Sequence, residues 1–120
     1  MKVIVAGGRD FNDYKFLENN LDQIFRDDAR FEFDVPVIVC GEAYGADKLG
    51  KQYAYNHNLS VDSYPAQWDK LGKSAGYRRN EMMAKVADMC IAFWDGESKG
   101  TKHMIETMKK LNKPVIIIKY

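Results

Sequence analysis

Three glycine-rich turns contain the residues of this sequence that are best suited to binding an anion. The turns span Gly7–Asp10, Gly41–Asp47 and Asp95–Thr101, and each follows a short apolar run. Glycine allows the backbone to approach a ligand closely and to adopt a positive φ. A helix that begins at Ser98 or Thr101 would direct free N–H groups and the positive end of its dipole into the third turn. This arrangement favours phosphate or another anion, and the alternative is that Ser98 is an ordinary N-cap.

Five apolar runs of strand length alternate with four stretches of helical periodicity. We expect strands at residues 2–6, 36–40, 59–65, 88–93 and 115–118. Helices are expected after Asp13, after Asp47, over 75–85 and after the third glycine turn. The alternation predicts an α/β, Rossmann-like three-layer sandwich, with helices on both faces of a five-stranded, mostly parallel sheet. Residues 1–120 suit one domain.

The predicted strand order is 3-2-1-4-5, because the polar–apolar alternation over 59–65 is typical of an edge strand. In this arrangement the strand order reverses between strands one and four, and ligands bind at such a switch point. All three glycine turns then lie on one rim of the sheet. The candidate ligand-binding residues on this rim are Gly7, Gly8, Arg9, Asp10, Gly41, Gly45, Ala46, Asp47, Trp68, Arg79, Asn80, Trp94, Asp95, Gly96, Ser98, Gly100 and Thr101.

Charged side chains on the rim suit the polar parts of a nucleotide. Arg9 and Arg79 would clamp an anion bidentately. Asp47 or Asp95 would accept hydrogen bonds from ribose hydroxyls. Structural alternatives stay open, since Arg79 also suits a solvated helix face and Asp47 also suits the positive end of a helix dipole.

Two tryptophans are candidates for stacking on a base. Trp68 lies in the loop that we expect over residues 66–74, and Trp94 lies at the end of the fourth strand. Trp94 would serve equally well as core packing. Asp10 has a comparable alternative, as a cap of the first helix together with Asp13.

Standard signatures of catalysis and metal binding are missing. The sequence contains no G-x-x-x-x-G-K-[ST], no G-x-G-x-x-G after the first strand and no G-x-S-x-G. His57 and His103 have no Cys or His neighbours at metal-ligand spacing, so we expect no metal and no cofactor. Cys40 and Cys90 lie in apolar runs and are expected to be buried thiols.

The composition is that of a soluble globular protein, with 46% hydrophobic and 29% charged residues. The net charge of +1 provides no global basic field for nucleic acid. No apolar run approaches the roughly 20 residues of a membrane span. The first residues lack the features of a signal peptide. We therefore expect a cytoplasmic protein of bacterial or viral type, located in the host cytoplasm if a phage encodes it.

Five ordered motifs resemble one known family. They are V-A-G-G-R-D-F at 5–11, G-x-A-x-G-A-D at 41–47, Y-P-A-x-W at 64–68, A-G-x-R-R-N-x-x-M at 75–83 and A-F-W-D-G-x-S-x-G-T at 92–101. This set is similar to the small, single-domain YspA-like members of the SLOG superfamily, which also contains the LOG phosphoribohydrolases and the DNA-processing protein DprA. The resemblance implies a Rossmann-like fold. It also implies a site for a nucleotide-derived ligand, such as an ADP-ribose or nucleoside-phosphate species.

The sequence departs from the LOG enzymes at one position. In those enzymes a glutamate follows the glycine–threonine pair and acts in glycosidic cleavage, whereas Met104 stands here. A thioether has no charge or proton to supply. Glu106 lies about 200° further around the helix and should face elsewhere. Glu42 or Asp95 would then be the remaining candidates for a catalytic carboxylate.

The leading hypothesis is a sensor or sequestering protein for a nucleotide-derived small molecule. One alternative is a LOG-like hydrolase of nucleotide N-glycosidic or phosphoribosyl bonds. Another is DprA-like binding of single-stranded DNA, for which lysines near the fourth helix would supply a basic face: Lys99, Lys102, Lys109, Lys110 and Lys113. A homo-oligomer is a further expectation, if methionines extend past the core; those in question are Met82, Met83, Met104 and Met108.

Overall fold

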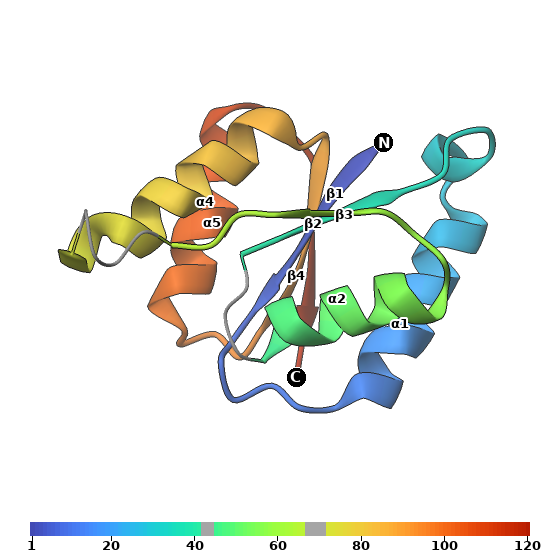
Figure 1. Ribbon diagram of the computed structural model, residues 1–120, viewed down its shortest axis with the longest axis horizontal. Coiled ribbons are helices and arrows are strands. Elements are labelled where there is room, and N and C mark those ends of the chain that lie inside the picture. The colour runs from blue at the N-terminus through green and yellow to red at the C-terminus, as the bar shows by residue number, and fades with distance from the viewer. Residues whose placement is uncertain (42–44, 67–71) are drawn as a thin grey trace.

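A parallel sheet forms the middle layer of the computed structural model, which describes residues 1–41, 45–66 and 72–120. Within these ranges, four helices cover the two faces of the sheet (Figure 1). The strands are β1 (Lys2–Gly7), β2 (Val37–Cys40), β3 (Val61–Ser63), β4 (Met89–Trp94) and β5 (Val115–Lys119). The helices are α1 (Tyr14–Asp27), α2 (Ala46–Asn56), α4 (Ala75–Val86) and α5 (Lys99–Lys110), with short 3-10 turns at Ala29–Phe31 and Gly72–Ser74.

The strand order is β3-β2-β1-β4-β5, as predicted, and every neighbouring pair is parallel. The three-residue β3 is an edge strand, in agreement with its alternating sequence. The switch point of the sheet, where successive strands begin to be added on the other side of β1, lies between β1 and β4. There Ala6 pairs with Ala92 and Gly7 with Phe93. The glycine turns that follow these two strands therefore begin side by side.

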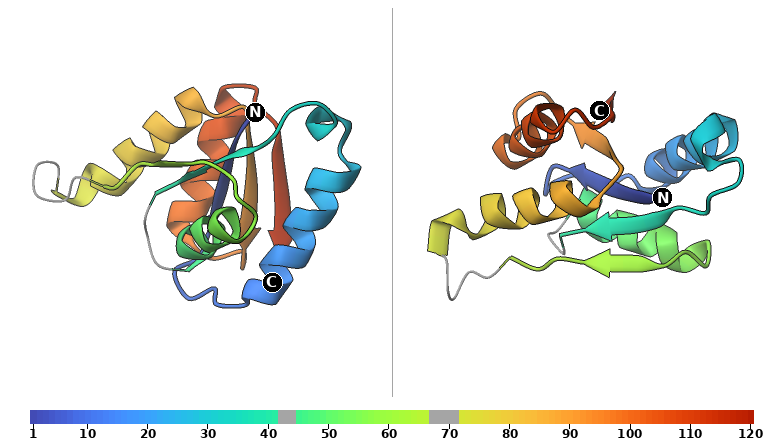
Figure 2. Two further views of the ribbon diagram at one scale, coloured as in Figure 1. Left: turned by 45° about the vertical axis from the view of Figure 1, so that its right-hand side comes forward. Right: turned by 90° about the horizontal axis from the view of Figure 1, so that it is seen from above.

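The helices divide into two layers. α1 and α2 lie on one face of the sheet, and α4 and α5 lie on the other (Figure 2). Alternate residues of β1 supply both cores, because successive side chains of a strand point to opposite faces. Val3 and Val5 pack with α1 and α2, whereas Ile4 and Ala6 pack with α4 and α5. Covering both faces explains why the β1 and β2 sequences are continuously apolar.

Local signals for helix α1 are confirmed in detail. The side chain of Asp13 accepts a hydrogen bond from the backbone N–H of Phe16 at 3.1 Å, which is an N-cap contact. Asn20 interrupts the apolar stripe, and its Nδ2 donates to the carbonyl of Phe16 at 2.8 Å. The following segment, which the sequence left unassigned, contains the 3-10 turn at Ala29–Phe31. Hydrogen bonds from Arg30 lower the pKa of Asp28, the cap of this turn, to about 2.

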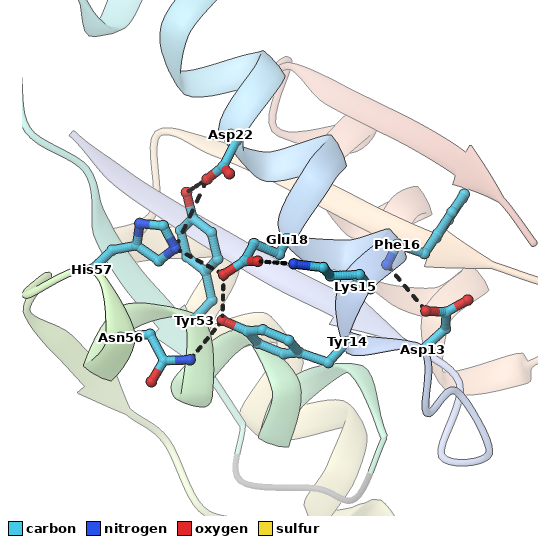
Figure 3. A network of polar contacts seen from close by, with 9 residues as sticks. All are labelled: Asp13, Tyr14, Lys15, Phe16, Glu18, Asp22, Tyr53, Asn56 and His57. Atoms are coloured by element: carbon cyan, nitrogen blue, oxygen red, sulfur yellow. Dashed lines mark hydrogen bonds and ion pairs between the residues drawn. The ribbon is translucent and has the colours of Figure 1, made fainter.

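A polar network joins α1 to the end of α2 (Figure 3). Tyr53 donates through its hydroxyl to Oδ1 of Asp22 at 2.7 Å, and burial raises the pKa of this phenol. Nε2 of His57 lies 3.2 Å from Oε2 of Glu18, and the hydroxyl of Tyr14 donates to the same oxygen at 3.1 Å. The hydrogen bond with His57 lowers the pKa of the Glu18 carboxyl. These contacts fix the C-terminal end of α2 relative to α1.

The sulfur-containing residues lie mainly in the core. Cys40 and Cys90 are completely buried, as predicted, and burial raises the pKa of the Cys90 thiol. Of the four methionines considered for an oligomer surface, Met83, Met104 and Met108 are buried and only Met82 is exposed. Within residues 1–41, 45–66 and 72–120, no helix combines the length and apolarity that spanning a membrane requires.

Replacing Gly50 with alanine should destabilise the fold, because α2 packs closely on β1 at this point. A Cβ at Gly50 would lie 2.9 Å from Cβ and Cγ1 of the fully buried Val5. Overpacking of this kind costs about 1–3 kcal/mol, and the gain in helix propensity offsets roughly 1 kcal/mol of that cost. Thermal unfolding of Gly50→Ala should show a melting temperature lower by several degrees.

Gly100→Ala provides the matched control for Gly50→Ala. Gly100 is also helical, but an added Cβ there would meet no atom within 4 Å. We expect this variant to melt at or slightly above the temperature of the unchanged protein. An equal loss of stability in both variants would contradict the packing explanation.

Candidate functional site

A pocket of about 500 Å³ lies at the carboxyl ends of β1 and β4, at the switch point of the sheet. Segments from β1, α2, α4 and α5 form its walls. The lining residues are Ala6, Gly7, Gly8, Arg9, Asp10, Asp47, Gly76, Tyr77, Arg79, Asn80, Met83, Ser98, Gly100, Thr101 and Met104. Ten of the predicted ligand-binding residues are in this set: Gly7, Gly8, Arg9, Asp10, Asp47, Arg79, Asn80, Ser98, Gly100 and Thr101.

The first glycine turn packs directly against the start of α2 and the end of β4. A Cβ at Gly7 would lie 2.5 Å from Cβ of Ala46 and 2.6 Å from the carbonyl oxygen of Phe93. The carbonyl of Gly8 accepts a hydrogen bond from the N–H of Ala46 at 3.4 Å. Gly45 has a φ of +80°, and an added side chain there would collide with the same Gly8 carbonyl. Gly45 and Ala46 thus support the pocket wall without lining the pocket.

The third glycine turn places the start of α5 at the pocket. Oδ1 of Asp95 accepts hydrogen bonds of 2.9 Å from the N–H groups of Glu97 and Ser98, and these bonds lower the pKa of Asp95. Ser98 occupies the N-cap position, but its hydroxyl pairs with that of Thr101 at 3.0 Å instead of capping a backbone N–H. Asp95 therefore shapes the turn from outside the pocket.

Trp94 has a structural role at this turn. Its indole N–H donates to the carbonyl of Ser98 at 3.1 Å, and its ring packs on the α4–α5 side of the core. Neither Trp94 nor Gly96 lines the pocket. Of the two alternatives for Trp94, the structure favours packing over stacking on a base. Trp68, the other candidate for stacking, and Glu42, a candidate carboxylate, lie outside the described residues.

Arg79 connects α4 to the end of β2. Its Nη1 donates to the carbonyl of Gly41, and its Nε donates to Oδ1 of Asn80 at 3.2 Å. Arg79 lines the pocket with one side and is not a freely solvated residue. Gly41 itself stays outside the lining and acts through this carbonyl.

Asn80 links α4 to α5. It is only 7% exposed, and its Nδ2 lies 3.3 Å from both the carbonyl of Gly100 and Nδ1 of His103. Since Arg79 Nε can only donate, Oδ1 of Asn80 is the accepting atom and Nδ2 is the donor. His103 Nδ1 must then accept and carry no proton. Burial lowers the pKa of His103, which agrees with a neutral ring.

Two aspartates complete the polar lining. Asp47 is 7% exposed in the first turn of α2, where a carboxylate complements the helix dipole. Asp10 is exposed and accepts a hydrogen bond from the hydroxyl of Tyr120 at 3.2 Å. Asp13 caps α1, and Asp10 instead contacts Tyr120 beside the first turn.

Several lining residues were not predicted as part of the site. Ala6, Met83 and Met104 form an apolar floor, and Gly76 and Tyr77 belong to the first turn of α4. Met104 occupies the position where the LOG enzymes have a glutamate, and it is 1% exposed. Gly76, a fixed position of the A-G-x-R-R-N motif, was the available signal for this wall, whereas Tyr77 falls on its unspecified position.

The described residues include no cluster of three His, Cys, Asp or Glu side chains that could hold a metal ion. The polar groups of the pocket are instead suited to hydrogen bonding. Backbone N–H groups at the start of α5, the two arginines and the two aspartates offer complementary donors and acceptors.

Comparison with known proteins places this architecture in the SLOG superfamily. The chain belongs to the YspA, cpYpsA-related SLOG family, YAcAr, whose family model matches residues 1–71. The Gene 61 protein of Mycobacterium phage D29 is 33% identical over 122 residues, which cover 96% of this chain and 94% of the phage protein. A shorter match, 46% identical over 43 residues, is to large ribosomal subunit protein bL25 of Chlorobium phaeovibrioides, and it covers 36% of this chain and 21% of that protein.

A solved structure shares the fold. It is DNA processing protein A from Helicobacter pylori, described for its single-stranded DNA binding mode. The TM-score is 0.67 at 20% sequence identity, and the match covers 98% of this chain. This chain spans 64% of the length of the Helicobacter chain, and at 20% identity the likeness concerns the Rossmann-like fold alone.

The hydrogen bonds around Asn80 predict a neutral His103 with its proton on Nε2. An NMR titration should therefore give a midpoint below about 6.5, the ordinary value, and nitrogen shifts of an unprotonated Nδ1 at neutral pH. A depressed pKa stabilises the fold above the ordinary pKa, and this contribution is lost as the pH falls through the folded-state value. His103→Gln would assign the resonance. A raised midpoint or a protonated Nδ1 would contradict the hydrogen-bonding scheme.

Proposed function

We propose that this protein binds a nucleotide-derived small molecule, such as a nucleoside phosphate or an ADP-ribose species, as a sensor or sequestering protein. One observation carries the proposal: the start of α5 and the Gly7–Gly8 turn border one pocket, together with Arg9 and Arg79. Membership of the SLOG family supports a nucleotide-related binding role. The phosphate would bind between the two turns, and Arg9 and Arg79 would balance its charge.

Access to the backbone at the start of α5 supports this placement. Gly100 is exposed and lines the pocket, and the space beside its Cα is open for 4 Å. Free N–H groups of the first helical turn can therefore donate to an anion without a side chain in between. Asn80 holds the Gly100 carbonyl from behind, which orients this turn before a ligand arrives.

Binding without turnover is favoured over glycosidic cleavage. Met104 fills the glutamate position of the LOG enzymes, and Glu106 is exposed, 4.0 Å from Lys102. Asp95 accepts two backbone hydrogen bonds outside the lining. If the protein were a hydrolase, chromatography would detect release of free base from a bound nucleotide. This assay can use the same samples as the binding experiment below.

Gly100→Val should weaken ligand binding at least tenfold while the fold is retained. The valine side chain would occupy the space beside the helix N-terminus that the phosphate requires. Thermal unfolding would be measured with nucleoside mono-, di- and triphosphates, NAD, ADP-ribose and its cyclic forms. A ligand at 100 times its dissociation constant adds about 2.7 kcal/mol to the stability of the unchanged protein.

Lys109→Val is the matched control for Gly100→Val. Lys109 is exposed in the last turn of the same helix and lies outside the pocket lining. The control should bind as the unchanged protein does. Equal ligand-induced shifts in Gly100→Val and in the unchanged protein would place the site elsewhere.

Binding of single-stranded DNA is a second candidate function, because α5 carries exposed lysines at both of its ends. Lys99 and Lys102 lie near the start of the helix, and Lys109 and Lys110 lie at its end. Lys113 is engaged elsewhere, since its Nζ donates to the carbonyls of Ala84 at 2.7 Å and Lys85 at 3.0 Å. The Helicobacter structure with the same fold is described for a DNA binding mode.

Fluorescence anisotropy with a labelled oligonucleotide tests the DNA candidate. If the lysines of α5 bind phosphates, affinity should fall steeply as salt increases, and Lys99→Ala with Lys102→Ala should reduce the salt dependence by about two phosphate contacts. Lys15→Ala is the control, because Lys15 is an exposed lysine on α1 and is not part of α5. Absence of binding at low salt would exclude this candidate.

A further inference from the structure

Tyr77 lines the pocket but takes no part in the anion-binding features described above. It lies in the first turn of α4, directly after Gly76, which has no side chain to fill the neighbouring space. The residue is 45% exposed, so part of its aromatic surface is accessible to a ligand. An aromatic surface therefore borders the pocket on the α4 side.

His103 supports the Tyr77 ring from α5. The two ring centroids are 4.4 Å apart, with an interplanar angle of 41°. His103 is in turn fixed by Asn80 at Nδ1 and by Thr107, whose hydroxyl lies 3.5 Å from Nε2 and donates to the His103 carbonyl at 2.7 Å. Tyr77 thus rests on a neutral, hydrogen-bonded ring. Its orientation is largely set before a ligand binds, so little conformational entropy is lost on stacking.

Tyr77 contacts α5 at His103, which lies beyond the helix start where the phosphate is proposed to bind. His103 follows Gly100 by three residues, which is about 4.5 Å along the axis of α5. Because Tyr77 packs on His103, its ring contacts α5 about one helical turn beyond Gly100. A phosphate at the helix start and a planar group on Tyr77 would then occupy separate parts of one pocket.

We propose that Tyr77 is the stacking surface for the base of the ligand. The pocket would then take a nucleoside phosphate in preference to a base-free sugar phosphate or inorganic pyrophosphate. Aromatic stacking accepts any base, because every base has a π-face, so Tyr77 would select for the presence of a base and not for its identity. This inference rests on the proposed function, since it assigns the second half of the same site.

Two substitutions separate stacking from simple packing. Tyr77→Phe keeps the aromatic face, whereas Tyr77→Leu keeps an apolar cover over His103 and removes that face. Tyr55→Leu is the control, because Tyr55 is 81% exposed on α2 and does not line the pocket. Circular dichroism would establish that each variant is folded.

The experiment is calorimetric titration with adenosine and cytidine monophosphates, ribose 5-phosphate and inorganic pyrophosphate. The unchanged protein, Tyr77→Phe and Tyr55→Leu should bind both nucleotides at least tenfold more tightly than ribose 5-phosphate. In Tyr77→Leu, nucleotide affinity should fall to that of ribose 5-phosphate, whose own affinity should be unchanged.

The possible failures are distinguishable. Equal binding of nucleotides and ribose 5-phosphate by the unchanged protein would overturn the role of Tyr77 and leave the phosphate site in place. This comparison needs no variant, so it holds even if Tyr77→Leu does not fold. Parallel weakening of every probe in Tyr77→Leu would indicate a purely structural residue. Absence of binding by these probes and by the thermal-unfolding panel, which includes NAD and ADP-ribose, would overturn the proposed function as well.

Discussion

The close approach of the Gly7–Gly8 turn to α2 and β4 is the constraint on which the rest of the structure depends. Gly7 lies against Ala46 and the Phe93 carbonyl, with no room for a Cβ. Gly45 reaches the Gly8 carbonyl only because glycine adopts a positive φ at low cost. Three segments distant in sequence meet here, and the glycines contribute only backbone to the contact. A side chain at either position would separate the elements whose ends form the pocket.

A second set of contacts braces the opposite wall of the pocket. Arg79 connects the end of β2 with Asn80, and Asn80 connects α4 with the Gly100 carbonyl and His103 of α5. Arg79 Nε can only donate, so the amide orientation of Asn80 and the histidine tautomer follow from the connectivity. The wall is therefore held by side-chain hydrogen bonds, whereas the first turn is held by close packing and by backbone hydrogen bonds to the Gly8 carbonyl.

The sequence was sufficient to predict the sheet order, because hydrophobic periodicity and three glycine turns are local signals. It also placed Asp13 correctly as the cap of α1. The sequence could not show which exposed residues of a predicted helix face the pocket, so Tyr77 was missed. Likewise, an aromatic residue at a strand end suits both packing and stacking, and only the contact with the Ser98 carbonyl shows that Trp94 packs. These distinctions depend on distances between elements that periodicity does not encode.

The floor of the pocket is also part of one of the two cores. Ala6, Met83 and Met104 line the pocket and belong to the apolar cluster that joins the sheet to α4 and α5. The α1–α2 layer has its own apolar cluster on the other face of the sheet, together with the polar network that joins α1 to the end of α2. Local opening of a protein follows such cooperative units, each with its own free energy. An occupied pocket would therefore lower the opening frequency of the α4–α5 layer, whose core forms the pocket floor, and it would reach the α1–α2 layer through Asp47 at the start of α2.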